Sequence, residues 1–347
     1  MQRTSAMTFP TEDWQAATPE GQGFDSQKLK VAVQYLADHC FEDKVEELMI
    51  IRNGYLIYQG DSIDKVHNVW SCSKSFTSTA LGLMIEDGRC QLDDKAATYE
   101  PALAERYPDV SLRHFATMTS GYNAAGSSRW QEESEDWSLT PYHPTDPIFA
   151  PGTAYAYWDE AMMMNGRTLT RILQGDLHSF LTERLTDPIG MGTWTWDEEG
   201  ELNGIPIRNG CTGVHLSARQ LARVGHLYLN KGNWNGTQVI NEAWTIQARQ
   251  PQVPADLPVA ETDRKATNGS GSYGYNWWVN GMTGKGRFMP DAPPGTAYMS
   301  GFNHNVCFVI PEWNVVYIRM GVDGNPAEGK HVVHNEFIKR LGLAMRR

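Results

Sequence analysis

The sequence of 347 residues lacks long apolar runs and has no excess of positive charge. No stretch approaches the roughly 20 apolar residues that span a bilayer, and residues 1–17 show no apolar segment of a signal peptide. The net charge of −11 disfavours nucleic acid and anionic membranes, since like charges repel. We therefore expect no membrane partner and no nucleic-acid partner.

Cysteine is also scarce, and the five cysteines are odd in number and scattered. Such a set in a chain without an export signal is typical of reduced thiols, so we expect a cytoplasmic protein. His331 and His334 have helical metal-ligand spacing, but no carboxylate or cysteine pattern supports a zinc site. We expect no metal and no other cofactor.

Apolar periodicity outlines the sheet of the protein. The dipeptide Asn53-Gly54 lies between two β-rich runs and predicts a hairpin over residues 47–58, because both turn residues accept positive φ. Strand-like runs return late in the chain, at residues 274–279, 297–300, 305–310 and 315–320. We therefore expect a mostly antiparallel sheet that is assembled from both ends of the chain.

The middle of the chain has a different character. Helical spacing recurs at residues 112–118, 169–185, 217–231 and 241–249, between loops rich in proline, glycine and tryptophan. Together with helical patterns at 26–40 and 331–343, these segments predict an α+β protein. We expect a sheet domain made of residues 1–92 and 266–347 and a mainly helical domain made of residues 93–265.

The segment 70–77 opens an apolar helix and contains Ser71 and Lys74. Residues three apart project from the same helix face, so the two side chains can meet. A serine becomes a good nucleophile when a neighbour takes its proton, and burial and the helix dipole lower the pKa of a lysine enough to do so. Taken alone, Ser71 is equally well explained as a helix cap, and Ser62 and Lys65 repeat the spacing in a polar loop.

A second motif lies in residues 151–159, where Pro-Gly predicts a loop. Tyr157 on this loop would complete a proton relay with Ser71 and Lys74, since a phenolate is favoured beside a protonated lysine. Lysine and tyrosine would then titrate as a unit. The alternative is that Tyr157 is a loop aromatic that packs on a neighbouring tryptophan.

A third motif precedes the strand at 306–310. The step Ser300-Gly301 lets the backbone approach a substrate closely. Acyl transfer needs two N–H donors for the oxyanion, and we expect Ser71 and Phe302 to supply them.

Two polar residues follow Phe302 and extend this third motif. Asn303 and His304 are candidates for hydrogen bonds to the substrate. Packing or solvent exposure explains His304 equally well. Cys72 follows Ser71, and on a helix its side chain points about 100° away from that of Ser71. We therefore expect the Cys72 side chain to pack in the protein interior.

The sequence resembles the serine β-lactamase and penicillin-binding-protein family, in its branch of esterases, class C-like enzymes and 6-aminohexanoate-oligomer hydrolases. Landmarks recur in family order within residues 45–325, beyond the three motifs, at 111–121, 149–153, 188–191, 217–222, 273–278 and 309–312. The resemblance implies a β-lactamase/transpeptidase-like fold with the active site in the cleft between a sheet domain and a helical domain. It also implies that Ser71 is acylated, that Lys74 is its partner and that Tyr157 belongs to the Tyr-x-Asn motif.

Two positions depart from the family pattern. Asp159 stands where the family usually has asparagine, and Met299 stands where it usually has lysine or histidine. That missing cation commonly helps to hold a substrate carboxylate, so its loss favours esters or amides without a carboxylate over β-lactams. An ionised Asp159 would favour a cationic or hydrogen-bond-donating substrate group.

These observations predict a serine hydrolase that acts through an acyl-enzyme on small esters or amides. Alternatives of the same class are a β-lactamase, a D-amino-acid peptidase and an amidase for linear amide oligomers. An alternative of another class is a non-catalytic module for ligand binding or assembly, against which the intact Ser71, Lys74 and Tyr157 argue. Whether the chain forms a homo-oligomer is left open.

Overall fold

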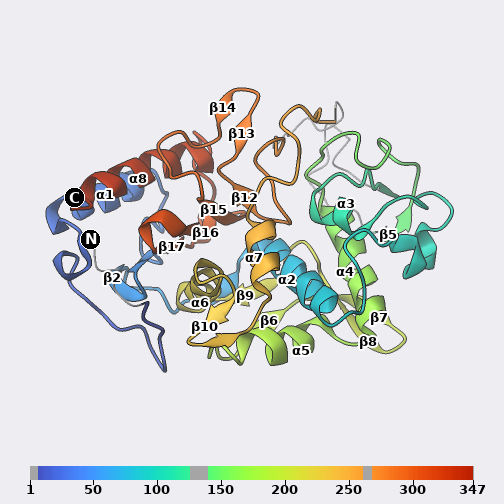
Figure 1. The fold of residues 1–347 in the computed structure, drawn as a ribbon, viewed down its shortest axis with the longest axis horizontal. Helices are drawn as coiled ribbons and strands as arrows, with labels where there is room; N and C mark the ends of the chain where they lie inside the picture. The colour runs from blue at the N-terminus through green and yellow to red at the C-terminus, as the bar shows by residue number, and fades with distance from the viewer. Residues whose placement is uncertain (1–6, 126–139, 261–267, 347) are drawn as a thin grey trace.

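The computed structural model describes residues 7–125, 140–260 and 268–346. Its largest sheet has six strands in the order β12-β15-β16-β17-β1-β2, and every neighbouring pair is antiparallel (Figure 1). The strands are β1 (Met49–Arg52), β2 (Tyr55–Gln59), β12 (Trp278–Val279), β15 (Ala297–Gly301), β16 (Asn305–Ile310) and β17 (Val315–Arg319). The early strand β1 pairs with the late strand β17, which confirms a sheet assembled from both ends of the chain.

The turn between β1 and β2 has the geometry that its sequence predicts. Asn53 and Gly54 have φ angles of 53° and 84°, as a tight hairpin turn requires. The N-terminal segment lies against this turn, where the Thr8 amide donates to the Asn53 carbonyl at 3.0 Å. A Cβ atom on Gly54 would lie 1.8 Å from the Thr8 carbonyl oxygen, so only glycine fits there.

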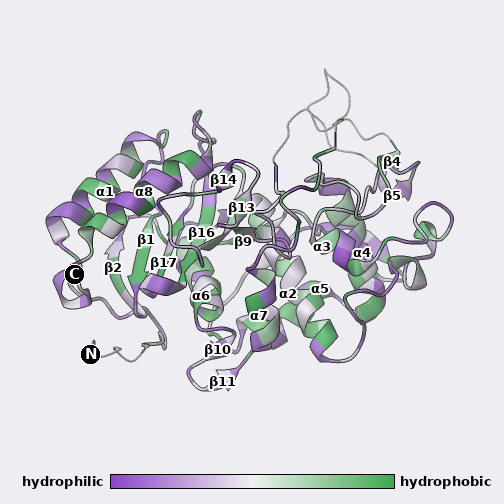
Figure 2. Cartoon of the chain, turned by 45° about the horizontal axis from the view of Figure 1, so that its top comes forward, coloured by the Kyte–Doolittle hydropathy of each residue, from purple (hydrophilic) through white to green (hydrophobic). Residues whose placement is uncertain are grey.

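The central sheet is covered on both faces. Successive residues of β17 alternate between two apolar layers, as the twofold period of a strand requires. Val315 and Tyr317 pack in the layer formed with α1 (Ser26–Asp38) and α8 (Lys330–Ala344), which run side by side in Figure 1. Val316 faces the opposite layer, which includes α6 (Ala218–Leu229). Figure 2 shows the result, with hydrophobic strands between helices of mixed hydropathy.

Helix α2 (Ser73–Glu86) lies at the centre of the molecule, and its first twelve residues are buried. It follows a 3-10 turn at residues 70–72, so the predicted helix is confirmed. Its buried hydroxyls donate to backbone carbonyls of other segments: Ser75 to Asn276 and Ser78 to Tyr275, both at 2.7 Å. Buried hydroxyls need such partners, and these bonds hold the segment before β12 against the helix.

The middle of the chain surrounds α2 with helices and short strands. The other helices are α3 (Leu112–Ala116), α4 (Asp159–Leu173), α5 (Leu177–Leu181) and α7 (Glu242–Ala248), besides short 3-10 and π turns. The small strands are β3 (His67–Asn68), β4 (Ala124–Ala125), β5 (Thr140–Pro144), β6 (Thr195–Trp196), β7 (Glu198–Leu202), β8 (Ile205–Arg208), β9 (Val214–Leu216), β10 (Asn233–Trp234), β11 (Thr237–Gln238), β13 (Met282–Thr283) and β14 (Gly286–Arg287). The second predicted domain boundary, at residues 265 and 266, lies outside the described residues, so the two-domain division stays a prediction.

Helix α4 begins at Asp159, whereas the sequence predicted a helix that begins near residue 169. Asp159 and Glu160 occupy its first turn, where the helix dipole favours negative charge. The start of this helix therefore places the second motif at a helix N-terminus.

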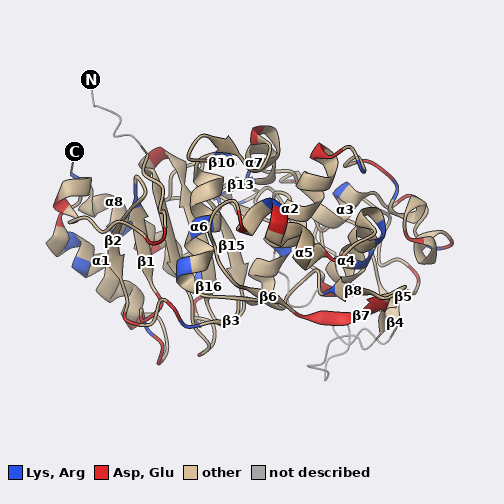
Figure 3. Cartoon of the chain, turned by 90° about the horizontal axis from the view of Figure 1, so that it is seen from below, with Lys and Arg blue, Asp and Glu red and all other residues tan. Residues whose placement is uncertain are grey.

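The charged residues lie mainly on the outside of the molecule. Figure 3 shows acidic and basic residues spread along the chain, with acidic residues concentrated on β7. Within the described ranges, no helix combines the length and the apolar character needed to cross a membrane.

Candidate active site

The turn that carries Ser71 is held in an unusual backbone conformation. Trp70 has a φ angle of 52°, which is rare for a bulky residue and marks a position fixed by its surroundings. The side-chain oxygen of Asn68 accepts hydrogen bonds from the Trp70 amide at 2.7 Å, the Gly213 amide at 3.2 Å and the Thr212 hydroxyl at 3.3 Å. Asn68 therefore holds this turn against residues 212 and 213 of the same chain. The sequence analysis did not identify it, although asparagine before a turn is a common local signal.

Lys74 lies beside Ser71, as its spacing predicts. Its side chain is 1% exposed, and its Nζ lies 2.8 Å from Ser71 Oγ. It also lies 2.6 Å from Asp159 Oδ1 and 3.2 Å from the carbonyl oxygen of Cys211. An ammonium group has three N–H donors, so these three oxygens match it completely.

The charge state of Lys74 follows from its pairing with Asp159. Burial is the largest single influence and favours the neutral amine, but the acidic neighbours, with Asp159 foremost, together raise the pKa of Lys74 above its ordinary value. The predicted lowering of this pKa is therefore wrong, because that prediction considered burial and the helix dipole without this carboxylate. The negative charge of Asp159 is compensated inside the protein, which removes the basis for expecting it to attract a cationic substrate group.

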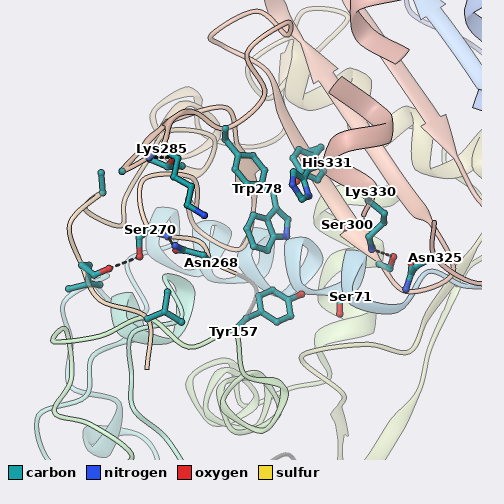
Figure 4. Close-up of a pocket in the computed structure, with 18 of the residues that line it drawn as sticks. Ser71, Tyr157, Asn268, Ser270, Trp278, Lys285, Ser300, Asn325, Lys330 and His331 are labelled. Carbon is teal, nitrogen blue, oxygen red and sulfur yellow. Dashed lines mark hydrogen bonds between the residues drawn. The ribbon is translucent and has the colours of Figure 1, made fainter. Parts of the chain in front are cut away.

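Tyr157 lines the same cavity, and its hydroxyl points toward Ser71 in Figure 4. The centre of its ring lies 4.8 Å from Lys74 Nζ. Its other face stacks on Trp278, with 5.9 Å between ring centres. Burial raises the pKa of Tyr157 against the opposing effect of the Lys74 ammonium, so the resting group is a phenol. The neighbouring Tyr155 is fully buried and is not part of this cavity wall.

Strand β15 brings the third motif against the turn of Ser71. Ser300, Gly301 and Phe302 all line the cavity. A Cβ atom on Gly301 would lie 2.1 Å from the Val69 carbonyl oxygen, so this close approach requires glycine. The ring of Phe302, which is 52% exposed, meets Trp70 edge to face at 5.5 Å. The oxyanion role of the Ser71 and Phe302 amides stays a prediction.

The last two residues of the third motif point elsewhere. Asn303 and His304 have φ angles of 57° and 59°, and this turn carries them away from the cavity lining. His304 is 1% exposed, and its Nε2 lies 2.9 Å from His334 Nε2 while its Nδ1 lies 3.5 Å from Cys40 Sγ. The structure thus opposes the expectation that these two side chains bind substrate and favours the packing alternative for His304.

The cavity beside Ser71 has a volume of about 1540 Å³, which exceeds the usual 300–1,000 Å³ of small-molecule sites. Its lining includes the stacked rings of Trp278, Phe288 and Tyr298, and also Lys285 and Arg287 from the β13–β14 hairpin. Figure 4 shows Lys285 and Ser71 on opposite sides of Trp278 in the cavity lining.

Lys330 is a cation of the site that the sequence analysis missed. It is the first residue of α8, and its Nζ donates to the Gly301 carbonyl at 2.5 Å. Burial lowers its pKa to about 8. Met299, at the position of the family's usual cation, is instead buried in the core. No local pattern in the sequence signals that Lys330 reaches β15, because the contact joins segments that only the fold brings together.

The family model named Beta-lactamase matches residues 47–330. The chain is 24% identical to the 6-aminohexanoate-dimer hydrolase of Paenarthrobacter ureafaciens over 293 residues, which are 76% of this chain and 72% of that protein. It is 27% identical to a beta-lactamase of Pseudomonas fluorescens over 126 residues, which are 35% of this chain and about a third (34%) of that relative's length.

Solved structures agree on the fold. A penicillin-binding-protein homologue from Caulobacter crescentus has a TM-score of 0.69 at 15% identity, covering 93% of this chain and 99% of the other. A family VIII carboxylesterase has a TM-score of 0.65 at 16% identity, covering 94% and 98%. The β-lactamase/transpeptidase-like fold is thus confirmed, and the chain belongs to the Beta-lactamase family.

Proposed function

We propose that the protein is a serine hydrolase that cleaves small esters or amides through an acyl-enzyme. The observation that carries this proposal is the hydrogen bond of 2.8 Å between Lys74 Nζ and Ser71 Oγ at the wall of a large cavity. Tyr157, directed at the same hydroxyl, supplies a second proton-transfer group. The names of two similar proteins, an amide-dimer hydrolase and a carboxylesterase, support both kinds of substrate.

The proposed reaction has two halves. Ser71 Oγ attacks the substrate carbonyl carbon, and the amides of Ser71 and Phe302 stabilise the oxyanion. Lys74 and Tyr157 deliver a proton to the leaving group as its bond to the carbonyl carbon breaks. Water then attacks the acyl-enzyme by the same route in reverse and releases the acid.

Lys330 favours substrates that carry a negative charge near the reacting carbonyl. No carboxylate lies within salt-bridge distance of its Nζ in the described part of the chain, and it lines the cavity next to β15. This cation argues against the expectation drawn from Met299 that carboxylate-bearing substrates are disfavoured. It also makes a carboxylate-bearing cyclic amide, as in a β-lactam, the second candidate substrate class.

The proposed location is the cytoplasm. All five cysteines are free in the structure, as is typical of a reducing compartment.

Turnover of p-nitrophenyl acetate and of a chromogenic β-lactam tests the proposed function. Ser71→Ala should abolish turnover, because it removes the hydroxyl that contacts Lys74 at the cavity wall. Ser62→Ala is the matched control, since Ser62 has a lysine at the same spacing but Lys65 pairs with Glu47 at 3.6 Å. If Ser71→Ala hydrolyses either substrate as fast as the wild type, the proposed function is wrong.

A further inference from the structure

The hydrogen bonds of Lys74 leave it unable to accept a proton in the resting site. As an ammonium it has three N–H donors and no lone pair, and three oxygens surround its Nζ. These belong to Ser71, Asp159 and Cys211, at 2.8, 2.6 and 3.2 Å. Lys74 must therefore lose a proton before it can take one from Ser71.

The other groups near Lys74 do not offer a ready acceptor. Burial keeps Tyr157 a phenol and raises the pKa of the Cys211 thiol, and Tyr273 is likewise held neutral by burial. The negative charge of Glu160, in the first turn of α4, adds to the rise in the pKa of Cys211. Lys330 is a further cation near the site, and the charge of Lys74 helps to lower its pKa. Among the described residues, the anion in hydrogen-bonding contact with Lys74 Nζ is the carboxylate of Asp159.

We propose that Asp159 is the proton acceptor that frees Lys74 to act as the base for Ser71. The inference rests on the proposed function, and it gives a chemical reason for a carboxylate at the position where the family usually has asparagine. The geometry supports it, since a single hydrogen bond of 2.6 Å joins Lys74 Nζ to Asp159 Oδ1.

The proton movements balance over the cycle. The Nζ–H bond to Asp159 breaks and the Oδ1–H bond forms, which leaves a neutral amine and a neutral carboxylic acid. Rotation about the terminal carbon–nitrogen bond of Lys74 by one staggered step turns the lone pair to Ser71. Lys74 takes the Ser71 proton as Oγ bonds to the carbonyl carbon, and the carbonyl electron pair moves to oxygen. Lys74 then protonates the leaving group, and Asp159 returns its proton to Lys74.

Burial offsets part of the cost of this transfer. Lys74 is 1% exposed and Asp159 is 22% exposed. Burial disfavours charged forms, so it reduces the free-energy difference between the ion pair and the neutral pair. An asparagine at this position could hold Lys74 by a hydrogen bond but could not store its proton.

The test is the rate at which a neutral fluorophosphonate labels Ser71, followed by intact mass from pH 6 to 10. The wild type should label at a rate that is independent of pH between 7 and 9. Asp159→Asn should label about 10²-fold more slowly at pH 7, the low end of general-base effects. Its rate should then rise about tenfold per pH unit, because Lys74 must lose its proton to solvent. Asp159→Glu should keep the flat profile, and Asp109→Asn removes an exposed charge at a distance as the control.

The outcomes separate this inference from the proposed function. If Asp159→Asn is folded by circular dichroism and labels with the rate and pH profile of the wild type, Asp159 only positions Lys74 and the inference is wrong. If Asp159→Asn does not fold, Asp159→Glu decides, since a rate rising with pH in that variant also contradicts the inference. If the wild type is not labelled at any pH, the proposed function itself fails.

Discussion

Replacing Lys330 with methionine should change which substrates the protein prefers. Methionine keeps an apolar stem of similar length and removes the ammonium. A substrate carboxylate about 4 Å from this charge would gain at most about 4 kcal/mol at an effective dielectric constant of about 20. The cost of removing both charges from water reduces this gain, and hydrogen bonds to charged groups measure about 1.5–3 kcal/mol. We expect a loss of about 2 kcal/mol, or about 30-fold.

The assay compares kcat/KM for two p-nitrophenyl esters of similar length, one with a terminal carboxylate and one with a methyl group. Lys330→Met should lower kcat/KM about 30-fold for the charged ester and leave the neutral ester nearly unchanged. In the wild type the preference should also fall as the pH rises above the pKa of Lys330, about 8, because the neutral amine cannot attract the carboxylate. Lys285→Met is the matched control, since this exposed lysine also lines the cavity and exposed pairs contribute little. Equal losses for both esters would refute the role of Lys330 in selecting charge.

Three further predictions follow from the packing of the site and the core. Tyr157→Phe should reduce turnover of p-nitrophenyl acetate by about 10²–10⁴-fold without changing the melting temperature much, and near-normal turnover would remove Tyr157 from the reaction. Gly301→Ala should reduce turnover about 10²-fold, because the added Cβ would lie 2.1 Å from the Val69 carbonyl oxygen and push β15 away from the turn of Ser71. Gly284→Ala is the control and should leave turnover unchanged, because the space around Gly284 is open. Burial lowers the pKa of His226 to about 4. Below about pH 6.5 the unfolded chain therefore binds a proton that the folded chain does not, so the free energy of unfolding decreases as the pH is lowered. Urea unfolding should therefore show that His226→Gln loses about 2 kcal/mol less stability than the wild type between pH 7 and pH 5; an identical loss would contradict this.

Local sequence patterns predicted the parts of the fold that depend on neighbours in the chain. Asn53-Gly54 specifies its turn by backbone preference alone, and the apolar run of β17 shows that the strand is covered on both faces. The spacing of Ser71 and Lys74 likewise places them together because a single helical turn does so. Each of these features needs only a few consecutive residues.

Most of the missed features depend on contacts between distant segments. Lys330 reaches Gly301 from the start of α8, and Asn68 holds residues 212 and 213. Asp159 pairs with Lys74 across 85 positions of the sequence, and it is the foremost of the acidic neighbours that together raise the pKa of this lysine. The direction of a pKa shift depends on the sum of burial and charge, and the partner charge is known only once the chain is folded.

The central claim is that Ser71 is an activated nucleophile. Its most direct test is the intact mass of the protein after exposure to a fluorophosphonate, with peptide mapping of the adduct, for the wild type and Ser71→Ala. We expect one adduct on Ser71 in the wild type and none in the folded Ser71→Ala variant. A folded wild type that takes no label, or an equal adduct on Ser71→Ala, would contradict it and favour a protein that keeps the fold to bind a ligand.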